Sequence, residues 1–272
     1  MMRATACHEN QEDFQCSGCL LEPRKPIDDR ICDWIDICHK TFQIGRAKPS
    51  SASERRAVKI LDVNTGTGIW AIDAAKSNPG STVIGIDTDR LHPRKHVSNV
   101  VFRSVDKIEG PWTQREVPEE FDFVHSRLVY PIPRNLDRLY RSCFDALSKG
   151  GILELEQMNW DICSDDDTIP PHSSLVEWVN VLKGVEQTGY EGTKTILEGI
   201  GFVDVAFEKI KLPINPGRMT YAEDDIGLWF NSVLNKLLEV TRLRWSGSRN
   251  NILESQVEQE IQSLRIHAYF RL

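Results

Sequence analysis

The sequence predicts an α/β fold with a mostly parallel sheet, and one stretch carries most of that prediction. Between Lys59 and Asp87, a short apolar strand, a turn with two glycines, a helical segment and a second apolar strand follow one another. Further apolar strands then alternate with amphipathic helices, a pattern typical of a parallel sheet with crossover helices. An acid, Asp87, ends the second strand, which suits a nucleotide-like ligand at the carboxyl edge of the sheet.

The glycine turn is the first candidate binding element. It has the sequence Asn64-Thr65-Gly66-Thr67-Gly68, and its glycines allow positive φ and a close approach of the backbone to a ligand. The helix predicted from Ile69 to Lys76 would point its free N–H groups at that ligand. The Asp87 carboxylate is able to accept hydrogen bonds from both hydroxyls of a ribose.

The turn is compatible with two classes of cofactor. Gly66-x-Gly68-x-x-Ala71 fits a nicotinamide or flavin dinucleotide fingerprint. Asp62-x-Asn64-x-Gly66-x-Gly68 resembles the acidic, glycine-rich first motif of enzymes that use S-adenosylmethionine (SAM). The turn alone does not decide between them. Asp62 is either a cofactor residue or a partner for the backbone amides of the turn.

Bulk properties exclude several classes of protein. A chain of 272 residues predicts one large domain, or one domain with a small lid. The net charge of −7 argues against a general nucleic-acid binder. We find no apolar run near the roughly 18 residues that a membrane span needs, and no signal peptide, so we expect no membrane partner and a cytoplasmic location. Seven irregularly spaced cysteines favour a reducing compartment over a disulfide framework.

Residues 1–27 are polar and without periodicity, which predicts a mobile tail. Cys7, His8, Cys16 and Cys19 raise the alternative of a zinc site. No second cysteine pair with finger-like spacing follows, so we expect no metal. The next segment, Asp28 to Phe42, has apolar residues at a helical period. We expect this helix to pack on the core, or to cap the cofactor with His39 near it, and residues 44–57 to form a linker.

The strands that follow supply two further candidate residues. Asp106 comes just after the strand predicted at Val100 to Arg103, where it would either accept from an adenine amine or cap a turn. The strand predicted at Glu120 to Ser126 delivers His125 to the carboxyl edge. His125 is our candidate for a general base toward a hydroxyl acceptor, with a purely structural histidine as the alternative.

The remaining elements complete the alternation of strands and helices. The run Asp165-Asp166-Asp167 lies in a predicted acidic loop, Asp161 to Ser173, and indicates solvated side chains rather than a divalent-ion site. We predict strands at Ile152 to Glu156, Val203 to Leu212 and His267 to Phe270, and helices at Leu136 to Leu147, Ser174 to Gly189, Thr193 to Gly199, Thr220 to Val240 and Asn250 to Leu264.

Several segments together resemble one family. They are LDVNTGTGIWAIDAA, VIGID, FDFVHSR, LSKGGILELEQ, GIGFVDV, KLPI and HAYF, in this order across residues 28–270. They resemble fungal LaeA-like methyltransferases, class I SAM-dependent enzymes found with secondary metabolism and its regulation. The resemblance implies a Rossmann-like fold with a seven-stranded, mostly parallel sheet, helices on both faces and an antiparallel final strand. It also implies a single domain over residues 28–272, with a helical lid at 216–264.

The resemblance further implies SAM as cofactor and a set of residues that bind it. This set is Asp62, Asn64, Gly66, Gly68, Asp87 and Asp106. The family has glycine where Asn64 stands. Asparagine tolerates left-handed φ better than other non-glycine residues, and its side chain would either donate to the methionine carboxylate or crowd it.

Three functions follow from these observations. The first is methylation of a small molecule in fungal secondary metabolism. The second is a regulator with weak or absent catalysis that acts through protein partners, as in velvet-type nuclear complexes, which would add a nuclear location. The third is a dinucleotide oxidoreductase, against which the Lys149-Gly150-Gly151 turn and Asp106 argue.

Overall fold

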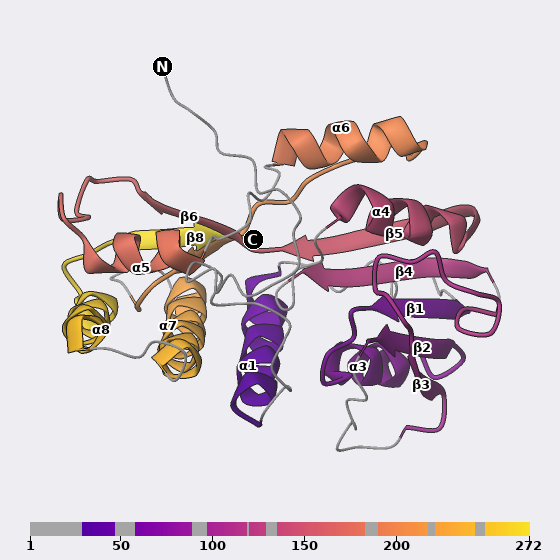
Figure 1. Cartoon of the computed structure of the whole chain (residues 1–272), viewed down its shortest axis with the longest axis horizontal. Helices are drawn as coiled ribbons and strands as arrows, with labels where there is room; N and C mark the ends of the chain where they lie inside the picture. Colours follow the sequence, from indigo (N-terminus) through magenta and orange to yellow (C-terminus); the bar gives the residue numbers. More distant parts are fainter. Residues whose placement is uncertain are drawn as a thin grey trace, which may run out of the picture.

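The computed structural model describes residues 29–46, 58–88, 97–118, 120–128, 135–182, 190–216, 221–242 and 248–272 (Figure 1). The predicted tail of residues 1–27, with its candidate zinc ligands, lies outside these ranges. So does most of the predicted linker of residues 44–57. Among the described helices, none combines the length and the apolar character that crossing a bilayer would require.

A parallel sheet forms one half of the structure, as predicted. Its order is β3-β2-β1-β4-β5, and every neighbouring pair is parallel. Helix α3 (Ile69–Ser77) packs on one face, whereas α4 (Leu136–Asp145) and α6 (Tyr190–Ile200) lie against the other (Figure 1). The strands are β1 (Lys59–Val63), β2 (Thr82–Asp87), β3 (Val100–Ser104), β4 (Phe121–Leu128) and β5 (Leu147–Gln157).

A second, antiparallel sheet corrects the prediction of one continuous seven-stranded sheet. It contains β6 (Asn159–Ser164), β7 (Lys211–Pro213) and β8 (Ala268–Arg271) in the order β6-β8-β7. Only Met158 separates β5 from β6. The split arises because the pairing partner changes at this residue: β5 pairs with β4 up to Gln157, and β6 pairs with β8 from Asn159. The predicted antiparallel final strand is therefore present, but in the second sheet.

Several strand boundaries also differ from the predictions. Strand β5 begins at Leu147 instead of Ile152, so the expected Lys149-Gly150-Gly151 turn lies within this strand. The strand expected at Val203 to Leu212 is limited to β7, and Val203 is 82% exposed, so the segment before β7 has no continuous face to bury. The first residues of the predicted acidic loop belong to β6 instead. Within the rest of that loop, two exposed carboxylates have partners in the second sheet and its flank: Asp165 pairs with Lys211, and Asp166 pairs with His267.

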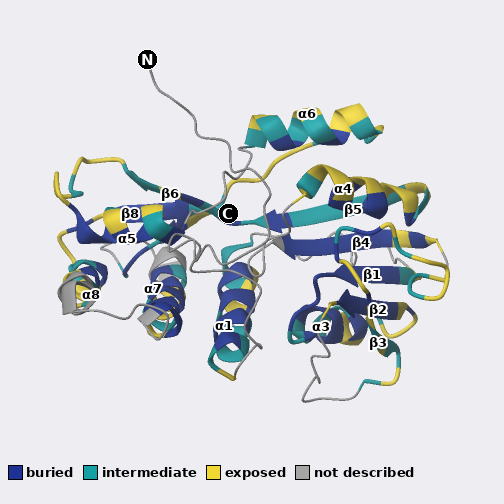
Figure 2. Ribbon diagram, in the orientation of Figure 1, coloured by how far each residue is buried: buried dark blue, intermediate teal, exposed yellow. Residues whose placement is uncertain are grey.

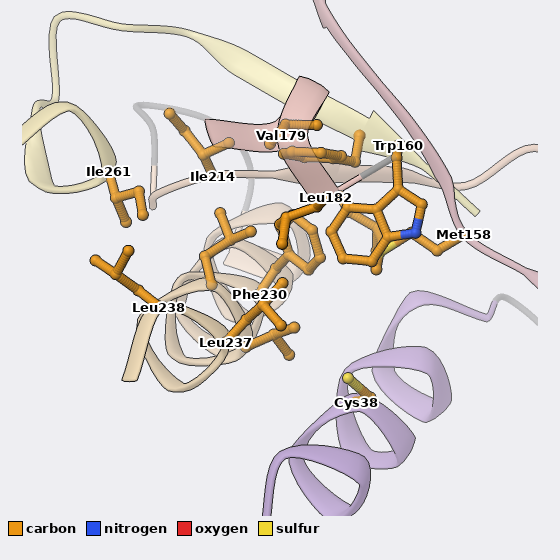
Figure 3. Packing of buried hydrophobic residues seen from close by; sticks show 14 of the residues in the cluster. Cys38, Met158, Trp160, Val179, Leu182, Ile214, Phe230, Leu237, Leu238 and Ile261 are labelled. Atoms are coloured by element: carbon orange, nitrogen blue, oxygen red, sulfur yellow. The ribbon is translucent and has the colours of Figure 1, made fainter. Parts of the chain in front are cut away.

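A large hydrophobic cluster lies between the second sheet and four helices. The helices are α1 (Asp29–Gly45), α5 (Ser174–Leu182), α7 (Tyr221–Arg242) and α8 (Ser248–Gln262). Figure 3 shows Phe230 and Leu237 of α7 near Trp160 of β6, with Cys38 on the neighbouring α1. Each fully buried side chain of this size contributes about 1.5–3 kcal/mol to stability. The cluster therefore fixes α1 against α7.

Helix α1 joins the two halves of the molecule. It stands between α7 and α3 in Figure 1, and its buried face in Figure 2 belongs to the cluster shared with α7. Its polar residues contact the half with the parallel sheet: Asp36 binds Thr67, and His39 binds Asp73. The predicted helix is thus confirmed, and one side of it adjoins the glycine turn.

Candidate functional site

The glycine turn has the left-handed conformation that its sequence predicts. The φ angles are 61° at Asn64, 55° at Gly66 and 74° at Gly68. Gly68 is the N-cap of α3 and supplies no side chain to cap it. The first N–H groups of a helix lack partners within the helix, so this end of α3 suits a polar or anionic ligand.

Asp87 lies directly against this turn. Its Oδ2 accepts a hydrogen bond from the backbone N–H of Gly66 at 2.9 Å, and its Oδ1 accepts from the N–H of Thr88 at 2.7 Å. The residue is only 4% exposed. The structure therefore brings together the glycine turn and the acid at the end of β2, which are 21 residues apart in the chain.

Asp62, near the end of β1, contacts the glycine turn that follows it. Its Oδ2 accepts from the hydroxyl of Thr65 at 2.5 Å, and its Oδ1 lies 2.7 Å from Nδ1 of His125. Burial raises the pKa of Asp62 to about 7, although the Thr65 hydrogen bond and the charge of Arg127 act in the opposite direction. Of its two sequence interpretations, this geometry favours the one in which Asp62 binds the turn itself, here through a side chain rather than backbone amides.

Gly85 makes room for this arrangement and was missed in the sequence. It is in register with Asp62 on the neighbouring strand. A Cβ at this position would lie 2.7 Å from the Thr65 hydroxyl and 2.7 Å from the Phe102 ring. A glycine inside a predicted strand often marks such a close approach, and this signal was available in Val83-Ile84-Gly85-Ile86.

His125 is fully buried, which does not suit its predicted role as a general base. Its ring stacks on Trp70 with 3.7 Å between centroids, and Nε2 lies 3.4 Å from Oε2 of Glu156. Burial, followed by the charge of Arg127, holds the pKa of His125 well below its usual range. A base must reach the proton that it removes, and no part of this ring reaches the surface.

Asp106 does not join the other candidates. It lies two residues beyond β3, on the same edge of the sheet, and is exposed. Its backbone N–H donates to Oε1 of Glu116 at 3.0 Å, and the same Glu116 carboxylate accepts from Thr113. Asp106 is thus an exposed residue held through its backbone, near the carboxyl end of β3.

A buried charge cluster lies beside the turn, and sequence reasoning did not find it. Arg127 at the end of β4 forms an ion pair with Glu156 of β5 and donates to Nδ1 of His39 at 2.9 Å. Arg46 pairs with Glu154 and Glu156. Charged residues in consecutive strands were the available signal, but His39, the partner of Arg127 on α1, lies 88 residues away in the chain.

Part of this cluster has the composition of a metal site. Within the described ranges, His125, Glu154 and Glu156 each place a ligand-type atom within 4.8 Å of the others. The guanidinium groups of Arg46 and Arg127 already pair with these carboxylates. Buried carboxylates are compensated either by metals or by such cations, and here the cations belong to the chain.

Comparison with known proteins defines the class. Residues 28–183 match a family model described as "Methyltransferase domain". The chain therefore belongs to the methyltransferase-domain family, in agreement with its α/β fold and its glycine turn.

Similar proteins narrow the class to LaeA-like proteins of fungi, as the sequence resemblance predicted. "Secondary metabolism regulator LAE1" of Cochliobolus heterostrophus is 30% identical over 90% of this chain and 85% of its own length. "Secondary metabolism regulator laeA" of Aspergillus flavus is 28% identical over 90% of this chain and 70% of its own length. "Protein-methionine methyltransferase laeA" of Emericella nidulans is 28% identical over 90% of this chain and 69% of its own length.

Proposed function

We propose that this protein binds SAM at the glycine turn and transfers a methyl group to a small molecule of secondary metabolism. The observation that supports this most is the turn itself. Three of its residues have positive φ. The turn leads directly into the N-terminus of α3, which no side chain caps. The buried Asp87 carboxylate accepts a hydrogen bond from the backbone of the turn. Such an arrangement suits the ribose and the amino-acid portion of a nucleoside ligand.

The residues present fit this cofactor. Gly66 and Gly68 would give the turn the positive φ angles with which its backbone adopts a tight loop around the cofactor, Asp87 would accept from the ribose hydroxyls, and the exposed Asp106 would accept from the adenine amine. Asn64 is 6% exposed, and its Nδ2 lies 3.5 Å from the backbone oxygen of Arg127, which turns the amide toward β4. This orientation favours a turn in which Asn64 does not crowd the ligand.

Bound SAM supplies an electrophilic methyl group, so the chain needs to contribute no nucleophile of its own. What the chain contributes is alignment of the acceptor and exclusion of water. Helix α1 lies on the turn, with Ile35 beside Gly66, and α7 packs on α1. Residues 216–264 are therefore our candidate lid. For His125 we propose that it holds Asp62 and does not act as the general base.

The alternative is a LaeA-like regulator that acts through protein partners, with weak or absent catalysis. It is favoured by what the relatives are named, since two are called regulators and one a protein-methionine methyltransferase. A protein acceptor and a metabolite acceptor would use the same cofactor site. The two functions differ in what receives the methyl group.

Labelled methyl groups distinguish these functions. The purified protein would be incubated with methyl-labelled SAM and either a fungal small-molecule extract or a fungal protein extract. We expect label in the small-molecule fraction, and none when the Asp87→Asn variant is used. Label in protein alone would replace the metabolite with a protein acceptor. Binding of SAM without label in either fraction would favour the non-catalytic regulator.

A further inference from the structure

Arg127 occupies a central place between three parts of the molecule. It belongs to β4, where it is in register with Glu156 of β5. Its guanidinium pairs with that carboxylate, donates to Nδ1 of His39 on α1, and lies 5.1 Å from the centre of the Phe42 ring. Its own backbone oxygen faces the side chain of Asn64 in the glycine turn.

The contact with His39 has a defined direction. A guanidinium has only donors, so Nδ1 of His39 accepts and its proton resides on Nε2. That proton faces Oδ2 of Asp73 on α3, and the distance between Nε2 and Oδ2 is 3.1 Å. Burial lowers the pKa of His39, which keeps the ring neutral in this role. A chain of polar contacts therefore runs from β5 through Arg127 and α1 to α3.

The same guanidinium acts electrostatically on Asp62. Its positive charge opposes the effect of burial on the pKa of that carboxyl, and Asp62 in turn accepts the hydroxyl of Thr65. A charged Asp62 accepts from both Thr65 and His125, whereas a protonated one loses part of this capacity. The protonation state of Asp62 thus affects the hydrogen bonds that hold the glycine turn.

We propose that Arg127 is a positioning residue of the cofactor site, which fixes α1 over the glycine turn through its contacts with His39 and Phe42 and supports the surroundings of Asp62, the residue that holds Thr65. The proposal rests on the function proposed above, and it adds a residue that touches neither the cofactor nor the acceptor. Arginine suits this place because its planar fork reaches two partners at once, which an ammonium group does not.

Other titratable or charged groups lie on the elements that carry the glycine turn, Asp62 and the partners of Arg127, and the pH dependence of binding reflects all of them. They are Asp36, Cys38 and His39 on α1, Arg46 after it, Asp73 on α3, Asp87 on β2, His125 and Arg127 on β4, and Glu154 and Glu156 on β5.

The test measures binding of S-adenosylhomocysteine by calorimetry from about pH 6 to pH 9, where a group with a raised pKa titrates. The variants are Arg127→Met and Arg127→Lys. The control is Arg141→Met, which removes an exposed arginine paired with Asp137 on α4.

We expect Arg127→Met to bind S-adenosylhomocysteine roughly tenfold more weakly, which is the effect of losing hydrogen bonds to charged groups. The pH at which binding is half lost should rise in this variant, because Asp62 protonates more readily without the positive charge of Arg127. Arg127→Lys should keep the midpoint of the unmodified protein, and Arg141→Met should change neither quantity.

Wild-type affinity and midpoint in Arg127→Met would overturn the proposal. So would weaker binding with an unmoved midpoint and no rescue by lysine, since that pattern indicates a merely structural arginine. If Arg127→Met does not fold, Arg127→Lys and Glu156→Gln are compared instead: Glu156→Gln removes the ion pair that anchors Arg127, and unchanged binding in both would contradict the proposal.

Hydrogen exchange of α1 separates this proposal from the proposed function. Without ligand, the amides of Asp29–Gly45 should exchange faster in Arg127→Met than in Arg141→Met. If the unmodified protein binds no S-adenosylhomocysteine, the proposed function fails, and exchange alone decides whether Arg127 positions α1. Equal exchange in the two variants would then refute the positioning role as well.

Discussion

Asp36 of α1 accepts a hydrogen bond from the hydroxyl of Thr67, with 2.6 Å between the two oxygens. This contact joins the helix to the middle of the glycine turn. Ile35 lies beside it, within 3.5 Å of the place where a Cβ on Gly66 would stand. The conformation of the turn is therefore supported by α1, through Asp36, and by Asp62 at the end of β1.

Removal of the Asp36 carboxylate should weaken this support. We expect Asp36→Ala to lower the free energy of unfolding by about 1 kcal/mol, a usual contribution for one hydrogen bond, and to weaken S-adenosylhomocysteine binding. Asp33→Ala on the same helix is the control, because Asp33 pairs with Lys236 of α7 and lies away from the turn. Denaturant unfolding and calorimetry measure the two effects. Equal behaviour of both variants would contradict the supporting role of Asp36.

A methyl group at position 85 should displace Thr65 or Phe102. Because the nearest atoms would lie 2.7 Å from the new Cβ, we expect Gly85→Ala to cost about 1–3 kcal/mol of stability, as overpacked sites do. Gly80→Ala is the matched control, since no atom lies within 4 Å of a Cβ there. Thermal unfolding compares the two. Similar melting temperatures would show that the Thr65 contact is not tightly packed.

The left-handed conformation of Asn64 gives a third prediction. Asn64→Gly should bind S-adenosylhomocysteine at least as tightly as the unmodified protein, because glycine adopts φ near 61° without strain. Asn64→Ala should lose about 1 kcal/mol of stability, because a Cβ without the polar group of asparagine disfavours this region. Calorimetry and denaturant unfolding test the pair. Tighter binding by the alanine variant would contradict this account of the turn.

Asp73 should make the protein sensitive to acid. The hydrogen bond from His39, with contributions from Lys76 and Gln43, holds the pKa of Asp73 below its usual range despite partial burial. A depressed folded-state pKa stabilises the protein above the unfolded pKa, and this stability is lost as the pH falls through the folded value. Asp73→Asn should therefore lose less stability than the unmodified protein between about pH 5 and pH 2. Asp137→Asn, on the exposed face of α4, is the control, and parallel curves for Asp73→Asn and the unmodified protein would refute the prediction.

The sequence was informative where the structure depends on local pattern. The spacing of Gly66 and Gly68 predicts a turn, and the ends of parallel strands share one edge, so the meeting of this turn with Asp87 was foreseeable. Asn64 was expected to tolerate positive φ, and it does.

The features that the sequence did not predict depend on contacts between segments far apart in the chain. The hydrogen bond from Arg127 to His39 requires α1 to lie over β4, which depends on the apolar cluster that α1 shares with α7. The break between β5 and β6 depends on which strand pairs with each side of Met158. His125 stood on the predicted edge, but Trp70 and the carboxylates that bury it come from other segments.

Calorimetric titration with SAM, S-adenosylhomocysteine and NADPH tests the central claim most directly. The claim is that the glycine turn and Asp87 form a SAM site. We predict saturable binding of SAM and S-adenosylhomocysteine, loss of that binding in Asp87→Ala, and no binding of NADPH. Binding of NADPH alone, or SAM binding that survives in a folded Asp87→Ala variant, would contradict it.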